Sequence, residues 1–140
     1  MLRTLLAGLL ALAISPAGAA PLSTLVIKVE KVSPRGGDVR VALYTEQNYG
    51  GDQDAVTDKV VPAHPGETVV TLENLKPGIY AVKLFQDFNR NGQFDMNWIG
   101  LPIEKYGFSN DARPTFSEPS FAATRFELRP GANTITIHLQ

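Results

Sequence analysis

The chain has 140 residues, 13 basic and 14 acidic side chains, a net charge of −1 at pH 7 and no cysteine. A balance this close to neutral gives no electrostatic case for binding nucleic acid or anionic membranes. The lack of cysteine excludes disulfides, thiol catalysis and zinc–thiolate sites, so stability must come from packing and from any bound ion.

Residues 1–19 have the pattern of a secretory signal peptide. A basic residue stands near the start, residues 5–14 form an apolar run, and Ala17-Gly18-Ala19 is an A-x-A cleavage site. The apolar run is shorter than the roughly 20 residues of a membrane-spanning helix. We therefore expect cleavage after Ala19, a periplasmic or secreted location, no stable membrane insertion, and one mature domain over residues 20–140. Cleavage would remove Arg3, so the mature chain would have 12 basic and 14 acidic side chains and a net charge of −2.

The mature chain reads as short strands joined by turns rich in Pro, Gly and Asn. Residues 25–32 and 39–44 alternate between apolar and polar, which predicts two half-buried strands paired as an antiparallel hairpin. A polar surface loop is expected next, over residues 45–58. The remaining strands are expected near 60–61 and over 68–72, 79–87, 121–128 and 134–139, with 79–87 at the centre of its sheet. This pattern predicts an all-β fold, a single antiparallel β-sandwich of about seven strands, prealbumin-like or Ig-like.

The stretch Asp87-Phe88-Asn89-Arg90-Asn91-Gly92-Gln93-Phe94-Asp95 has the spacing of a calcium-binding loop. Oxygen-bearing side chains at alternate positions reach one ion as the backbone curls, and glycine at the sixth position allows a tight turn. The predicted ligands are the side chains of Asp87, Asn89, Asn91 and Asp95 and the carbonyl of Gln93.

An EF-hand would complete the shell with a glutamate at position 12, where this chain has Trp98. Glu104, or as a weaker alternative Asp111, is expected to supply the missing carboxylate. So few charged ligands predict weak calcium binding, at about 10⁻⁴ to 10⁻³ M. The alternative is a metal-free loop whose Asp and Asn side chains cap their own backbone.

Aromatic residues crowd the second half of the chain. Phe85, Phe121 and Phe126 occupy strand positions and are expected in the core. Three other residues lie among Gly and Pro, where burial is harder, and we interpret them as a recognition surface for a small ligand or an envelope protein: Trp98, Tyr106 and Phe108.

No catalytic constellation is evident. Ser109 is not in a G-x-S-x-G elbow, and His64 and His138 lack metal-ligand spacing and are expected on the surface. Asp95 and Glu104 could act as an acid/base pair in an envelope hydrolase, but nothing in the sequence fixes their separation. We therefore expect a protein that is not an enzyme.

The Asp87–Asp95 loop is followed by the segment Gly100-Leu101-Pro102-Ile103-Glu104-Lys105-Tyr106-Gly107-Phe108-Ser109-Asn110. These two motifs, in this order, resemble the bacterial secreted family filed as domain of unknown function 2141. The matching positions are Asp87, Asn89, Asn91, Gly92, Asp95, Gly100, Pro102, Glu104, Tyr106, Gly107, Phe108 and Ser109. The resemblance implies a β-sandwich and export, and it implies no activity. Gln86 stands where many members are expected to have histidine, which weakens a metal-hydrolase hypothesis.

These patterns together predict an exported binding module in which a weak calcium loop orders the aromatic surface beside it. The alternative is a structural or assembly module of the cell envelope with a self-capped, metal-free loop. An indifference to chelators would distinguish the second from the first.

Overall fold

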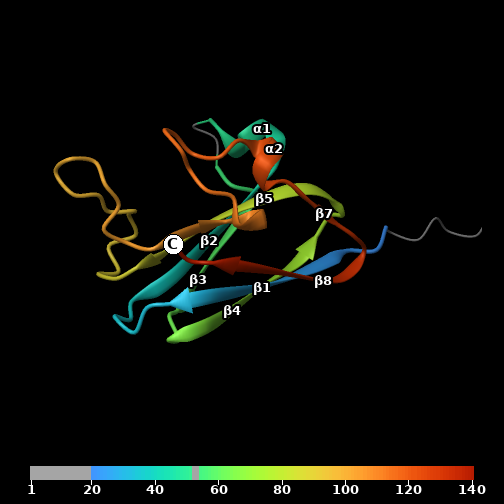
Figure 1. The fold of residues 1–140 in the computed structure, drawn as a ribbon. Coiled ribbons are helices and arrows are strands. Elements are labelled where there is room, and N and C mark those ends of the chain that lie inside the picture. Colours follow the sequence, from blue (N-terminus) through green and yellow to red (C-terminus); the bar gives the residue numbers. More distant parts are fainter. Residues whose placement is uncertain (1–19, 52–53) are drawn as a thin grey trace, which may run out of the picture.

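The computed structural model describes residues 20–51 and 54–140 (Figure 1). The predicted signal peptide, residues 1–19, lies outside the described residues. Strands predominate, and two single-turn helices and a 3-10 turn (η1) connect them. In chain order the elements are β1 (Ser23–Val32), β2 (Asp38–Tyr44), α1 (Glu46–Tyr49), β3 (Thr57–Pro62), β4 (Gly66–Leu75), β5 (Gly78–Asp87), β6 (Tyr106–Phe108), η1 (Ser109–Asp111), α2 (Phe121–Thr124), β7 (Phe126–Leu128) and β8 (Gly131–His138).

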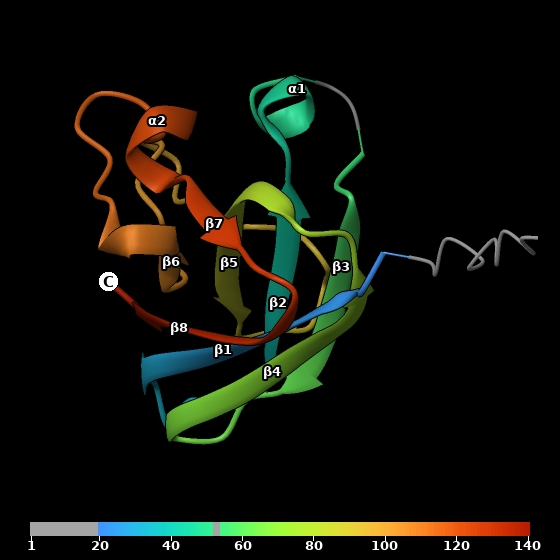
Figure 2. The same cartoon turned by 90° about the vertical axis from the view of Figure 1, so that its right-hand side faces the viewer.

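The strands form two sheets, so the all-β prediction is confirmed (Figure 2). One sheet has the order β4-β1-β8, and the other has the order β3-β2-β5-β6 with β7 also paired to β5. The central place predicted for residues 79–87 is confirmed, because β5 pairs with β2, β6 and β7. The described residues contain eight strands, and β8 runs parallel to β1, unlike the purely antiparallel arrangement that we expected.

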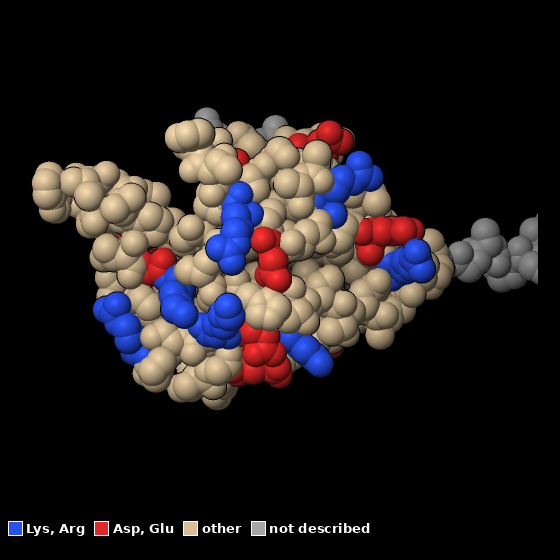
Figure 3. All heavy atoms as spheres, in the orientation of Figure 1, with Lys and Arg blue, Asp and Glu red and all other residues tan. Residues whose placement is uncertain are grey.

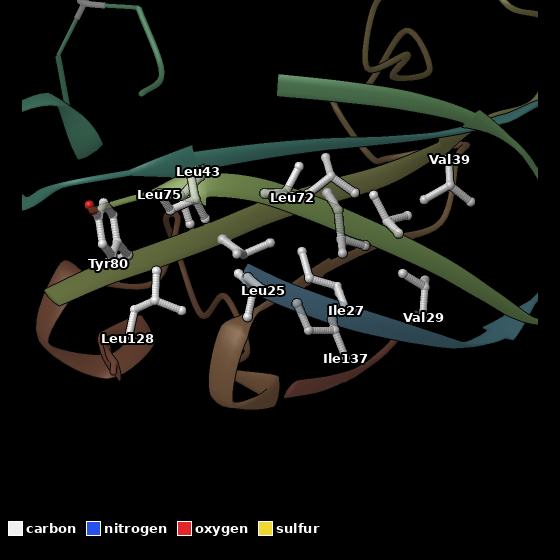
Figure 4. Close-up of a cluster of buried hydrophobic side chains, with 14 of the residues drawn as sticks. Leu25, Ile27, Val29, Val39, Leu43, Leu72, Leu75, Tyr80, Leu128 and Ile137 are labelled. Carbon is white, nitrogen blue, oxygen red and sulfur yellow. The ribbon is translucent and has the colours of Figure 1, made fainter. Parts of the chain in front are cut away.

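One cluster of aliphatic side chains is shared by the two sheets (Figure 4). Alternate residues of β1, such as Ile27 and Val29, point inward and meet Val39 and Leu43 of β2. All four side chains are fully buried. The period of two in the sequence is therefore the inward and outward alternation of strands that bury one face.

The predicted hairpin between residues 25–32 and 39–44 is wrong, because β1 and β2 belong to different sheets. The connection crosses between the sheets instead of turning back within one. Gln86, fully buried on β5, holds it: its Nε2 donates to the carbonyls of Ser33 (2.9 Å) and Gly36 (2.8 Å), and its Oε1 accepts from the Ser33 amide (2.9 Å). Apolar and polar residues alternate in two strands that face one another across a core just as they do in two strands that pair. Periodicity alone therefore did not distinguish a hairpin from a crossing between sheets.

Other local predictions also need correction. Residues 121–124 form a helical turn before the short strand β7, because the Ser120 hydroxyl caps the turn by accepting from the Ala123 amide. The loop predicted over residues 45–58 contains α1 and the start of β3. Phe85, expected in the core, is half-buried on the outer face of β5.

Phe121 is also only half-buried and packs edge-on against Tyr49, while Phe126 is half-buried against the core cluster. Within the described residues, no helix is long and apolar enough to cross a membrane.

Candidate functional site

The predicted calcium loop begins where the central strand β5 ends. Asp87, its first residue, is fully buried. One carboxylate oxygen, Oδ2, accepts from the Gly92 amide at 2.8 Å and from Arg40 Nε at 2.6 Å. The other, Oδ1, accepts from the Asn91 amide at 3.2 Å. Gly92 has a φ of +77°, so the tight turn predicted at this glycine is present, and Asp87 closes the loop around it.

The two asparagines form the next layer of the loop. The Oδ1 atom of Asn89 accepts from the Asn91 amide at 3.2 Å, and that of Asn91 accepts from the Gln93 amide at 2.9 Å. Both Nδ2 groups then donate to the Asp95 carboxylate, at 2.9 Å from Asn89 and 2.9 to 3.0 Å from Asn91. The side chains of Asn89 and Asn91 therefore converge on Asp95.

Glu104, the predicted last calcium ligand, contacts the loop from further along the chain. Its side chain is buried, with Oε1 accepting from the Phe88 amide at 3.1 Å and Oε2 from the Asp95 amide at 3.0 Å. The Ile103 amide also donates to the Asp95 carbonyl at 3.1 Å. Asp111, the alternative ligand, lies elsewhere and holds His138 on β8, Oδ2 to Nδ1 at 2.7 Å.

Three carboxylates thus lie at the loop, together with two paired cations: Arg40 binds Asp87, and the loop's own Arg90 binds Asp38 on β2 at 3.1 Å. Burial raises the pKa of Glu104, and the charges of Asp95 and Asp87 add to that rise against the two amides that it accepts from. Burial also opposes ionisation of Asp87, but the Arg40 hydrogen bond and the Gly92 and Asn91 amides outweigh it and hold the pKa of this carboxyl below its usual range. Glu104 is therefore the carboxyl group that burial and its acidic neighbours make harder to ionise.

As it stands, the loop is held by its own side chains in the manner of Asx-turns. Within residues 20–51 and 54–140, no three acidic, histidine or cysteine side chains are placed together as a ready-made metal cage. The amide groups of Asn89 and Asn91 occupy the position where a cation would meet Asp95. Rotating each amide would present Oδ1 in place of Nδ2, giving a set of oxygen ligands of the kind that calcium prefers.

The predicted recognition surface is divided between two places. Tyr106 and Phe108 lie on β6 with ring centroids 6.1 Å apart, and Phe94 continues the row at 5.6 Å from Tyr106 and 5.5 Å from Phe85. This row lines a cavity of about 380 Å³ on the outer face of the β3-β2-β5-β6 sheet, with Arg40 and Lys83 among its other walls. Trp98 is not in this row and is 96% exposed on the segment that follows the loop.

Arg40 and Phe94 are site residues that the sequence reasoning missed. Arg40 could have been found from its position on the polar face of the strand 39–44, but its partner Asp87 depends on the pairing of β2 with β5. Because the predicted hairpin paired β2 with β1, the pairing of β2 with β5 was not expected.

Ser109 and the histidines are not brought together in the described part of the chain. Ser109 is buried, donating through its hydroxyl to the Thr124 carbonyl at 2.5 Å and accepting from the Val82 amide at 2.9 Å. His64 and His138 are exposed, as predicted. The serine therefore joins η1 to β5 and α2.

Fold and site together define an all-β protein of two sheets, with an acidic Asp/Asn loop closing the end of its central strand. Residues 27–136 match the model of a bacterial family, DUF2141, described as an uncharacterized protein conserved in bacteria, and the chain belongs to this family. The resemblance seen in the sequence is therefore confirmed. No match was found among curated proteins or among solved structures.

Proposed function

We propose that the protein is an exported, non-enzymatic binding module, built on a single prealbumin-like or Ig-like sandwich. Its Asp87–Asp95 loop binds calcium weakly and orders the apolar surfaces next to it. The observation that supports this proposal most is that hydrogen bonds tie three carboxylates, Asp87, Asp95 and Glu104, into one loop. Burial raises the pKa of Glu104 most, and the charges of Asp95 and Asp87 add to the rise; a divalent ion would favour the ionised form of this carboxyl group.

The covalent order of the chain explains why an ion here would affect binding. Asp95 and Glu104 stand at the two ends of the segment that carries Trp98, and Glu104 is two residues before Tyr106 on β6. Fixing both carboxylates on one ion would therefore fix both ends of the segment and the start of the aromatic row. The partner would be a small ligand or another component of the envelope.

We expect calcium to raise the thermal midpoint of unfolding by several degrees relative to EDTA. An ion that binds only the folded state adds RT ln(1 + [L]/Kd), about 1.4 kcal/mol at a tenfold excess over Kd. Magnesium, which demands a smaller and more regular oxygen shell, should have little effect. Differential scanning fluorimetry in EDTA, calcium and magnesium measures these shifts.

The matched variants for this experiment are Asp95→Asn, which removes a carboxylate from the loop, and Asp58→Asn, which removes an exposed one from β3. Asp95→Asn should lose the calcium shift and Asp58→Asn should retain it. Equal behaviour of the protein in calcium and EDTA would contradict the proposal. It would favour the second candidate, a structural module of the envelope, for which the specific support is the self-capped hydrogen bonding of Asn89 and Asn91.

A further inference from the structure

A segment with no charged residue projects from the body of the protein between Asp95 and Glu104. We call residues 96–103 the apolar tip (Figure 1). The side chains that it exposes are Trp98 (96% exposed), Ile99 (57%), Leu101 (56%), Met96 (54%) and Ile103 (53%). Figure 3 shows the projection without a single acidic or basic side chain, beside a body that carries both. Five large apolar side chains exposed within eight residues exceed the scattered exposure that is normal on a protein surface.

Most backbone amides of the apolar tip donate hydrogen bonds within the tip or at its base. The Asn97 amide donates to the Leu101 carbonyl at 2.8 Å, and the Gly100 amide donates to the Asn97 carbonyl at 3.0 Å. The Asn97 side-chain oxygen accepts from the amides of Ile99 and Leu101 at 3.1 and 3.0 Å. The only polar side chain of the tip is thus directed at its own backbone. Such a segment can leave water at low cost, because it takes few unpaired donors with it.

Two basic residues flank the base of the tip. Arg35 and Lys105 line a shallow concavity of about 510 Å³ together with Leu101 and Ile103. The Arg35 guanidinium lies 4.1 Å above the Phe88 ring, which leaves its nitrogen donors at the edge. Lys105 Nζ donates to the Lys31 carbonyl at 3.0 Å, and an ammonium group has two further donors. Apolar surface and cationic donors therefore stand side by side.

We propose that the apolar tip docks the protein on a phospholipid surface, with Trp98, Ile99 and Leu101 entering the interfacial layer and Arg35 and Lys105 facing lipid phosphates. The tip offers a protein partner almost no side-chain hydrogen bond, whereas a lipid interface requires none. Tryptophan is also favoured at the level of the lipid headgroups. Docking of this kind is peripheral and needs no membrane-spanning segment.

The net charge of the whole chain gave no reason to expect a membrane partner, because a net charge does not show where basic side chains lie on the surface. A phospholipid surface would be the partner of the proposed binding module, and this assignment rests on the proposed function. It does not require calcium. Asp95 and Glu104 lie at the base of the tip, so an ion in the loop would also weaken their repulsion of anionic lipids.

The test uses Trp98, the only tryptophan in the chain, as a reporter. Purified protein is titrated with phosphatidylcholine vesicles containing a quarter phosphatidylglycerol, in EDTA and in calcium. We expect a blue shift of Trp98 emission and quenching by lipids with brominated acyl chains. The double variant Ile99→Ser/Leu101→Ser, which keeps the reporter and all of the tip's hydrogen bonds, should bind at least tenfold more weakly in flotation.

Two matched variants separate the parts of the site. Phe116→Ser removes another exposed aromatic side chain outside the tip and should bind as the wild type does. Arg35→Gln/Lys105→Gln should weaken binding to the anionic vesicles more than to pure phosphatidylcholine. Because every variant has the same N-terminus, differences between them report on the tip and its base.

An unshifted Trp98 spectrum with vesicles would overturn the inference, and so would equal flotation of the wild type and the Ile99→Ser/Leu101→Ser variant. Insertion in EDTA without any calcium-dependent thermal shift would support lipid docking and contradict calcium binding. A calcium-dependent thermal shift without insertion in either buffer would support calcium binding and contradict lipid docking.

Discussion

Replacing Gly37 with alanine should destabilise the fold by about 3–5 kcal/mol. A Cβ at this position would lie 2.0 Å from the Asp87 carbonyl oxygen and 2.7 Å from the Phe88 Cα. Both contacts are with backbone, so no side-chain rotation relieves them. The crossing between the sheets must then move away from the start of the acidic loop. Urea unfolding measures the change.

Gly36 provides a matched control for this substitution. It has the same φ of +81° as Gly37, but a Cβ there would meet nothing within 4 Å. Gly36→Ala should therefore cost only the left-handed backbone strain, about 1–2 kcal/mol. Equal losses in the two variants would show that the close approach of Gly37 to Asp87 is not important.

Asp87→Asn should cost about 2–4 kcal/mol at pH 7 in the presence of chelator. An amide cannot accept from Arg40 Nε, Gly92 and Asn91 together, and its NH₂ group would face one of these donors. Arg40 keeps 29% of its side chain exposed, so water compensates part of the loss and keeps the effect below that of a fully buried pair. Asp58→Asn should change stability by less than about 0.5 kcal/mol.

The difference between wild type and Asp87→Asn should also depend on pH. The folded protein holds the pKa of Asp87 below its usual range, so the unfolded chain takes up this proton first as the pH falls. The stability that Asp87 contributes is therefore fully present above about pH 4–5 and is lost as the pH falls through the folded pKa. Urea unfolding at pH 7 and near pH 2 should show that the difference in unfolding free energy between wild type and Asp87→Asn is smaller in acid. A difference that stays constant or widens would contradict the assigned role of Asp87.

Local strand patterns were predictable because each depends on a few neighbouring residues. The alternation of apolar side chains in residues 25–32 and 79–87 located β1 and β5 and the face that each buries. The pairing of strands depends on residues far apart in the chain. No local sequence feature distinguished a hairpin from a crossing between sheets. Gln86 holds that crossing through Gly36 and Ser33, which are 50 and 53 positions away in the chain.

The candidate site divides in the same way. The spacing from Asp87 to Asp95 predicted calcium ligands, with Glu104 completing the set. In the structure Asn89 and Asn91 donate to Asp95, and Glu104 accepts from the Asp95 amide, while the role of these residues as ligands stays a prediction. Arg40 was missed because its contact with Asp87 spans two strands. The separation of Trp98 from Tyr106 depends on the path of the apolar tip, which sequence proximity alone did not reveal.

The most direct test of the central claim, that the Asp87–Asp95 loop is a calcium site, is a calcium titration of isotope-labelled protein followed by NMR. The side-chain amide signals of Asn89 and Asn91 and the backbone amide of Asp95 are observed. Calcium, unlike magnesium, should move these signals in a saturable way with a midpoint at about 0.1–1 mM, because both amides must rotate away from Asp95 to coordinate the ion. Signals that stay in place up to about 10 mM calcium, well above the expected range of Kd, would contradict the claim and leave the loop a self-capped turn.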